Sequence, residues 1–268
     1  MSVVLGKYEF LGDMDTFLYL ETQLDNANKE EPEAKFCNSL KHKPENKAQL
    51  INTCKRFVTL FKLSKNQCDN KFSTDGRKYI EFMNYWLNYK LSSIPKYEDI
   101  KTDFYKEFQT KYSEFQADNI LNEKIYDINK ETYKNMYILY RLYKIFDQIK
   151  QGTMKYDKGI EEFKIIYNNA LKQCILETDD NFYKALDKFR NYYRINISNV
   201  KSCTNGKCPT LPELTYEYEQ IDPKTPMIGY KLVQSVNNIL YKELTKITKE
   251  KVYYHLLFIL HKRIYINI

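Results

Sequence analysis

The 268-residue chain has few residues that favour turns, with only 7 glycines and 7 prolines. Long alternating runs of β-branched residues are also scarce. A β-sandwich or a β-barrel needs many tight turns and alternating strands, so the composition favours an all-α fold. Since 43% of the residues are hydrophobic and 15% are aromatic, the composition also excludes a disordered chain.

Motifs for catalysis are missing as well. The sequence has no G-x-S-x-G elbow, no glycine-rich phosphate loop and no histidine placed near a cysteine or serine in a recognisable order. The acidic pairs Glu161–Glu162 and Asp179–Asp180 are typical of helix starts and solvated surfaces. We therefore expect no enzyme, no cofactor-binding site and no catalytic residue.

No hydrophobic run is long enough to span a bilayer. The apolar residues 253–260 are interrupted by His255 and followed by basic residues, whereas a spanning helix needs about 20 apolar residues. We expect this segment to lie in a buried amphipathic helix. An interfacial anchor, or a span missing from the end of this chain, remains an alternative.

The charge is moderate and evenly spread. The formal net charge is +7, from 42 basic and 35 acidic residues, and lysines alternate with acids along most of the expected helices. A solvated helix face has this pattern, while a nucleic-acid site concentrates its basic residues. We expect no nucleic-acid partner.

Helical periodicity runs through most of the chain. We expect helices over residues 13–26, 45–63, 77–91, 96–117, 129–150 and 160–176, another after the caps at 178–180, and a last one over 230–263. Short links predict antiparallel packing, so the expected architecture is an irregular multi-helix bundle with a long closing C-terminal helix. The apolar faces predict a structural core that contains Phe57, Phe61, Trp86, Tyr140 and Phe163.

The composition changes near residue 199. Four of the seven prolines and two of the seven glycines lie in residues 199–229, which predicts a long surface loop. We therefore expect a helical body over 1–198 with a cysteine-containing N-terminal part (1–95), the Pro/Cys loop, and a C-terminal helix over 230–268 that packs on the body. Together they would form one domain.

The six cysteines are the candidates for covalent bracing. They are Cys37, Cys54, Cys68, Cys174, Cys203 and Cys208. An even number favours disulfides, although fifteen connectivities are possible, and Cys54 and Cys174 would also suit buried thiols on apolar helix faces. Disulfides imply an oxidising compartment, yet the first residues, MSVVLGKYEF, show no secretory signal.

The closest cysteine pair, Cys203 and Cys208, encloses an Asn-Gly turn signal, so a local disulfide is one reading. Half of a zinc site is the other reading. Zinc would need a second ligand pair, and His42, His255 and His261 are too scattered to supply it. We expect no metal.

Three segments carry a family resemblance. They are TCKRFVTLFK around Cys54, YIEFMNYWLNYKL after Cys68, and CPTLPELTYEYEQ from Cys208. With these segments the chain resembles the Plasmodium interspersed repeat variant antigens, most closely the Vir branch of Plasmodium vivax, over nearly its whole length.

The resemblance implies a helical antigen that is exported into the infected red cell, displayed at or near its surface, and involved in immune evasion and host-receptor adhesion. The implied partner is a host cell-surface protein or an antibody. Similar proteins often lack a cleaved signal, which would reconcile disulfides with this N-terminus. Many relatives carry a C-terminal membrane span, whereas this chain shows none, and it also shows no export element of the Arg-x-Leu-x-acidic type.

Two hypotheses about location and binding follow from the resemblance. Loops carry recognition more often than core elements do, so we expect binding first at residues 27–44 and 199–229. The alternative function is an exported scaffold inside the red cell, at its membrane or at parasite trafficking structures.

Overall fold

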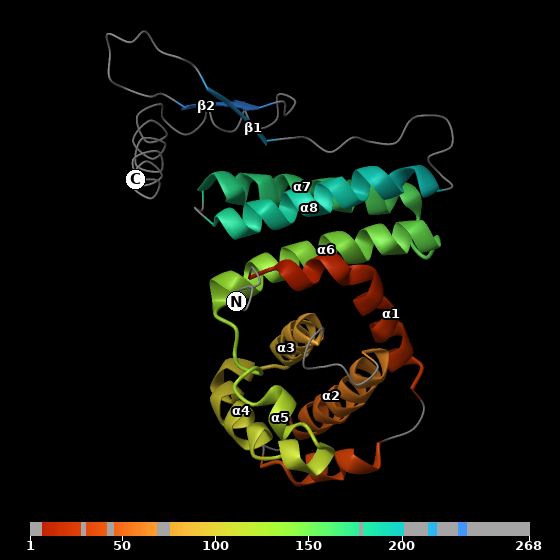
Figure 1. Ribbon diagram of the computed structural model, residues 1–268, viewed down its shortest axis with the longest axis vertical. Coiled ribbons are helices and arrows are strands. Elements are labelled where there is room, and N and C mark those ends of the chain that lie inside the picture. The colour runs from red at the N-terminus through yellow and green to blue at the C-terminus, as the bar shows by residue number, and fades with distance from the viewer. Residues whose placement is uncertain are drawn as a thin grey trace.

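The computed structural model describes residues 7–27, 31–41, 46–68, 76–176, 179–200, 214–218 and 230–234. Within them the fold is all-α apart from one two-stranded ladder, so the predicted fold class is confirmed (Figure 1). The α-helices are α1 (Met14–Asp25), α2 (Lys47–Gln67), α3 (Arg77–Ser92), α4 (Lys101–Gln109), α5 (Asp118–Leu121), α6 (Lys130–Gln151), α7 (Tyr156–Leu176) and α8 (Asp180–Asn196). The 3-10 helices are η1 (Glu9–Asp13), η2 (Pro32–Ser39), η4 (Tyr97–Asp99), η5 (Tyr112–Phe115) and η6 (Ile197–Asn199).

Helix α6 connects two groups of helices. On one side it packs with α7 and α8, and the three lie alongside one another (Figure 1). On the other side it contacts α1 and α3, which pack in turn with α2. The 3-10 helix η1 also joins the groups, because it contacts α3, α6 and α8.

Both ends of α6 follow from local sequence. The side chain of Asn129 accepts a hydrogen bond from the backbone N–H of Thr132 at 2.9 Å, which caps the first turn. At the other end Gly152 has a φ of +69°, the left-handed conformation that ends many helices and that glycine adopts at little cost. The predicted helix over 129–150 is therefore confirmed.

The start of α8 is fixed by Asp179. Its carboxylate accepts hydrogen bonds from the backbone N–H groups of Asn181 and Phe182 at 3.0 and 3.1 Å. It also accepts a hydrogen bond from the Tyr8 hydroxyl at 2.6 Å. One aspartate thus caps a helix and ties the N-terminal segment to it.

The single helix predicted over 96–117 is wrong. The structure divides this segment into η4, α4 and η5. Just after α4, the Thr110 hydroxyl donates to the backbone oxygen of Glu107 at 2.6 Å, and Gln116 adopts a φ of +58°. Side-chain hydroxyls that bond to nearby carbonyls compete with helix continuation. The aromatic stripe is still buried, since the core includes Tyr105, Phe108, Tyr112 and Phe115.

The helix predicted over residues 230–263 is wrong at its N-terminal end. Strand β2 (Tyr230–Gln234) pairs antiparallel with β1 (Leu214–Tyr218), so residues 230–234 do not begin a helix, and the predicted loop 199–229 contains a strand. The first segment alternates Leu214, Tyr216 and Tyr218 with more polar residues, and the second contains Tyr230 and Val233; aromatic and β-branched residues favour strands. The remainder of 201–268 lies outside the described residues, and the division of the chain into body, loop and closing helix stays a prediction.

The core is rich in aromatic rings. All five side chains that the sequence assigns to the structural core are buried: Phe57, Phe61, Trp86, Tyr140 and Phe163. Several of them pack against other buried rings, for example Phe57 edge to face against Phe108 with 5.2 Å between the ring centroids, and Phe163 stacked on Tyr193 at 5.0 Å. In the part of the chain that the structure describes, no helix combines the length and apolarity of a membrane span.

Candidate functional site

A buried disulfide braces one end of the molecule. Cys37 in η2 and Cys54 in α2 are bonded, with 5.8 Å between their Cα atoms, and both are fully buried. The bond holds η2 against the middle of α2, the helix that η2 packs against. This is one specific pairing among the alternatives that the sequence left open.

The other cysteines differ in their placement. Cys68 follows the last residue of α2 and Cys174 lies in α7, and both are buried without a disulfide bond. Cys203 and Cys208 lie outside the described residues, so the choice between a local disulfide and half a zinc site stays untested. Within the described residues, no three His, Cys, Asp or Glu side chains are grouped to hold a metal ion.

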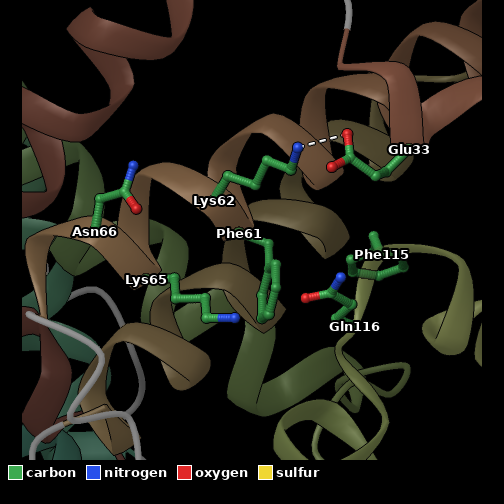
Figure 2. A pocket seen from close by; sticks show the side chains of 7 residues that line it. All are labelled: Glu33, Phe61, Lys62, Lys65, Asn66, Phe115 and Gln116. Carbon is green, nitrogen blue, oxygen red and sulfur yellow. Dashed lines mark ion pairs between the residues drawn. The ribbon is translucent and has the colours of Figure 1, made fainter.

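A hollow of about 390 Å³ opens between the elements that the disulfide joins and the end of η5, although neither cysteine lines it. Its lining comes from η2, α2 and the end of η5, namely Glu33, Phe61, Lys62, Lys65, Asn66, Phe115 and Gln116 (Figure 2). Figure 2 shows Lys65 and Gln116 ending on either side of the Phe61 ring, while Lys62 turns to Glu33. Ligand pockets commonly combine an apolar floor with a few polar groups of this kind.

The disulfide joins η2 and α2, and aromatic side chains of both elements pack on Phe115 in the floor of this hollow. Phe36 is the neighbour of Cys37, and its ring stacks on that of Phe115 with centroids 5.8 Å apart. Phe61 lies two helical turns after Cys54 on the same face of α2 and meets Phe115 edge to face at 5.3 Å. Both walls of the hollow are therefore linked to the same covalent bond.

The charged rim is largely neutralised. The ammonium of Lys62 contacts Glu31 at 2.7 Å and Glu33 at 2.5 Å. Burial alone would lower the pKa of Lys62, but hydrogen bonds to the two glutamates raise it, and the bond from Lys62 lowers the pKa of Glu33. Lys65 remains as the cation that faces the hollow without a carboxylate within ion-pair distance in the described part of the chain.

The described lining of the hollow contains no histidine. All three histidines, His42, His255 and His261, lie outside the described residues, so the described hollow has no imidazole base. Elsewhere, burial raises the pKa of tyrosines such as Tyr85 and Tyr105, which keeps their hydroxyls protonated. The described lining provides two phenyl rings, two side-chain amides, one carboxylate and two ammonium groups, and the ammonium of Lys62 is paired with glutamates.

The segment 27–44, predicted as a binding loop, is only partly a loop. It contains η2, whose Ala34, Phe36 and Cys37 are buried, while Pro32 and Lys35 face solvent. The sequence did not predict this 3-10 helix, because the helix is short and its apolar residues do not follow the α-helical period. The spacing of Ala34, Cys37 and Leu40 by three residues was the signal that could have revealed it.

The chain matches one known protein family over most of its length. The model of the Plasmodium vivax Vir protein family matches residues 17–256, which is most of the chain. The chain belongs to the Vir family. The resemblance seen in the sequence is thereby confirmed, and membership indicates a variant antigen of Plasmodium. Neither a curated protein nor a solved structure matches the chain.

The Vir match covers every element that builds the hollow. η2, α2 and η5 all fall inside residues 17–256. The disulfide-braced end is thus part of the family domain and not an appendage to it.

Proposed function

We propose that this Vir protein is a non-enzymatic variant antigen that is exported to the infected red cell and acts by binding. Host proteins or antibodies would be its partners, and the disulfide-braced hollow with the exposed side of η2 would be one contact surface. The buried Cys37–Cys54 bond beside this hollow, in a member of the Vir family, is the observation that carries the proposal.

Two physical arguments support it. Disulfides persist in oxidising surroundings, which fits a protein that leaves the parasite cytosol. A covalent brace also keeps the hollow in one shape, so that less conformational entropy is lost when a ligand binds. Exposed residues around such a rigid frame can vary in sequence without altering the core.

The location can be tested on intact infected cells. Protease treatment of the outer surface should remove the protein from non-permeabilised cells, as detected with an antibody against a described helix. Complete survival of the protein, with cleavage only after the cells are permeabilised, would favour a scaffold inside the red cell and refute surface display.

The contact surface can be tested with matched charge changes. Lys65→Glu should weaken binding of antibodies or receptors selected on the native protein, because it reverses the charge that faces the hollow. Lys188→Glu makes the same change at an exposed position of α8, far along the chain from the hollow, and should leave that binding unchanged. The same weakening by both variants would show that only net charge matters and that the hollow does not bind.

Recognition by the predicted segments can be tested by exchange. Replacing residues 27–44 or 199–229 with those of a relative should transfer antibody or receptor recognition from that relative. Unchanged recognition after both exchanges would place the variable surface elsewhere.

A further inference from the structure

Lys90 near the end of α3 is an unusual cation. Its ammonium lies over the ring of Trp86 at 5.5 Å and over the ring of Tyr89 at 5.3 Å from the centroids. The side chain is half-buried, and no carboxylate lies within ion-pair distance of it among the described residues. Ring faces attract a cation, but they do not neutralise its charge.

Other cations over rings in this protein do have a carboxylate. Three such pairs occur along α6: Arg141 with Glu162, Lys144 with Glu21 at 3.3 Å, and Lys150 with Asp15 at 2.9 Å. The arrangement of ring, cation and acid is therefore complete at these positions. At Lys90 none of the residues that the structure describes supplies the acid.

The two acids whose charges act on Lys90 are already engaged by other groups. Glu21 accepts hydrogen bonds from the Tyr140 hydroxyl at 2.8 and 2.9 Å and contacts Lys144, and Asp25 pairs with Arg56. Burial lowers the pKa of Lys90. Glu21 and Asp25 oppose that effect from a distance, whereas Lys144 and Arg56 add to it. An added carboxylate would therefore enter a place where positive charge is in excess.

Half-buried tyrosines continue the surface from Lys90. The Tyr89 ring stacks on Tyr137 of α6 with centroids 6.0 Å apart, and Tyr137 stacks on Tyr133 at 6.3 Å. α3 and α6 pack directly against each other, so these rings form one continuous strip across the two helices. We call Tyr89, Lys90, Tyr133 and Tyr137 the Lys90–tyrosine surface. Tyrosine is enriched in protein–protein interfaces, because its ring provides a large contact area at a low cost in side-chain entropy while its hydroxyl remains solvated.

We propose that the Lys90–tyrosine surface binds an acidic segment of a partner protein, with one carboxylate on Lys90 and an adjacent apolar or aromatic side chain on Tyr89 and Tyr137. The chemistry favours a peptide carboxylate over a sulfated glycan or a phospholipid surface. Polyanions bind best to several unpaired cations or to bidentate arginines, whereas this surface offers one unpaired ammonium between rings. The proposal concerns a different surface from the disulfide-braced hollow and does not depend on where the protein is displayed.

A peptide selection on the full chain tests this proposal. A display library of random 12-residue peptides is selected on the folded protein, and each selected peptide is measured against Lys90→Met, Lys90→Arg and Lys106→Met. We expect a class of peptides with Asp or Glu beside an aromatic residue whose affinity falls at least tenfold on Lys90→Met, because a hydrogen bond to a charged group is lost. Lys90→Arg should restore most of that affinity.

The controls separate recognition from structure. Methionine keeps the apolar stem over Trp86, so Lys90→Met should retain the circular dichroism spectrum and thermal midpoint of the wild type. Lys106→Met removes an exposed charge on α4 and should not alter peptide binding. The proposal is refuted if no selected peptide depends on Lys90. It is equally refuted if heparin or phosphatidylserine vesicles show a Lys90-dependent affinity and acidic peptides do not.

Discussion

Loss of the Cys37–Cys54 bond should destabilise the whole domain. The two cysteines are separated by 17 positions in sequence, and the bond is fully buried between η2 and α2. In the folded protein η2 and α2 also pack against each other through other residues, so the bond is not the sole contact between them. The main effect is therefore on the unfolded chain, which gains conformational freedom when the loop opens.

The loop length sets the expected magnitude. Opening a loop of this size should favour the unfolded state by about 3 kcal/mol at 25 °C. For a chain of this length that free energy corresponds to a fall of about 6–12 °C in the thermal midpoint. The measurement is equilibrium unfolding monitored by circular dichroism. The protein is first unfolded and refolded with or without a reductant, because a reductant does not reach the buried bond in the folded state.

A double variant isolates this bond from any other. Cys37→Ala together with Cys54→Ala is measured under the same two conditions, so that effects of reductant at Cys203 and Cys208 cancel in the comparison. The wild type should lose about 3 kcal/mol more than the double variant on reduction. A difference below about 1 kcal/mol, or native protein in which Cys37 and Cys54 react with an alkylating reagent after denaturation without reductant, would refute the reasoning.

Three further predictions concern single groups in the core and at a helix end. Tyr140→Phe removes the hydroxyl that donates to Glu21 and should cost about 1–3 kcal/mol of unfolding free energy, whereas Tyr126→Phe, at a ring that is 55% exposed, should change it by less than about 0.5 kcal/mol. Equal effects in urea titrations would contradict the role of that hydrogen bond. Gly152→Ala should cost about 1–2 kcal/mol because of its positive φ, and Gly12→Ala, with open space around its Cβ position, should be nearly neutral. Similar thermal midpoints for the two alanine variants would argue against the left-handed C-cap. Because burial raises the pKa of many tyrosines above 10.0, the unfolded state loses protons first as the pH rises, so stability should fall above about pH 10. Phenolate absorbance should then appear together with loss of helix, and titration of all 25 tyrosines in a chain that is still folded would contradict it.

Long helices with local end signals could be predicted from the sequence. The apolar positions of α2, α3 and α6 repeat with the helical period, and Asn129 and Gly152 mark the two ends of α6 through their own backbone chemistry. The buried residues Phe57, Trp86 and Phe163 follow from the same periodicity. Each of these features depends on residues close together in the chain.

Features that depend on distant residues could not be predicted in the same way. The pairing of Cys37 with Cys54 is set by how η2 packs on α2, and nothing in the spacing distinguishes it from a bond to Cys68. The break after α4 arises where a threonine hydroxyl competes for a backbone carbonyl, which periodicity does not record. The missing acid at Lys90 becomes visible only when α1, α2, α3 and α6 are placed together.

The position of α6 has a consequence for how relatives in this family could diversify by recombination. The α7–α8 hairpin meets the N-terminal helices mainly through α6 and η1. An exchange of gene segments with its crossover in the turn at residues 152–155 would therefore move two helices together, and the incoming pair would need to match chiefly α6 and η1, together with the contact of Tyr192 with Asp15 of α1. Crossovers inside α6 would instead give a helix whose two halves come from different relatives and do not match the helices packed on both sides of it. Selection should remove such recombinants.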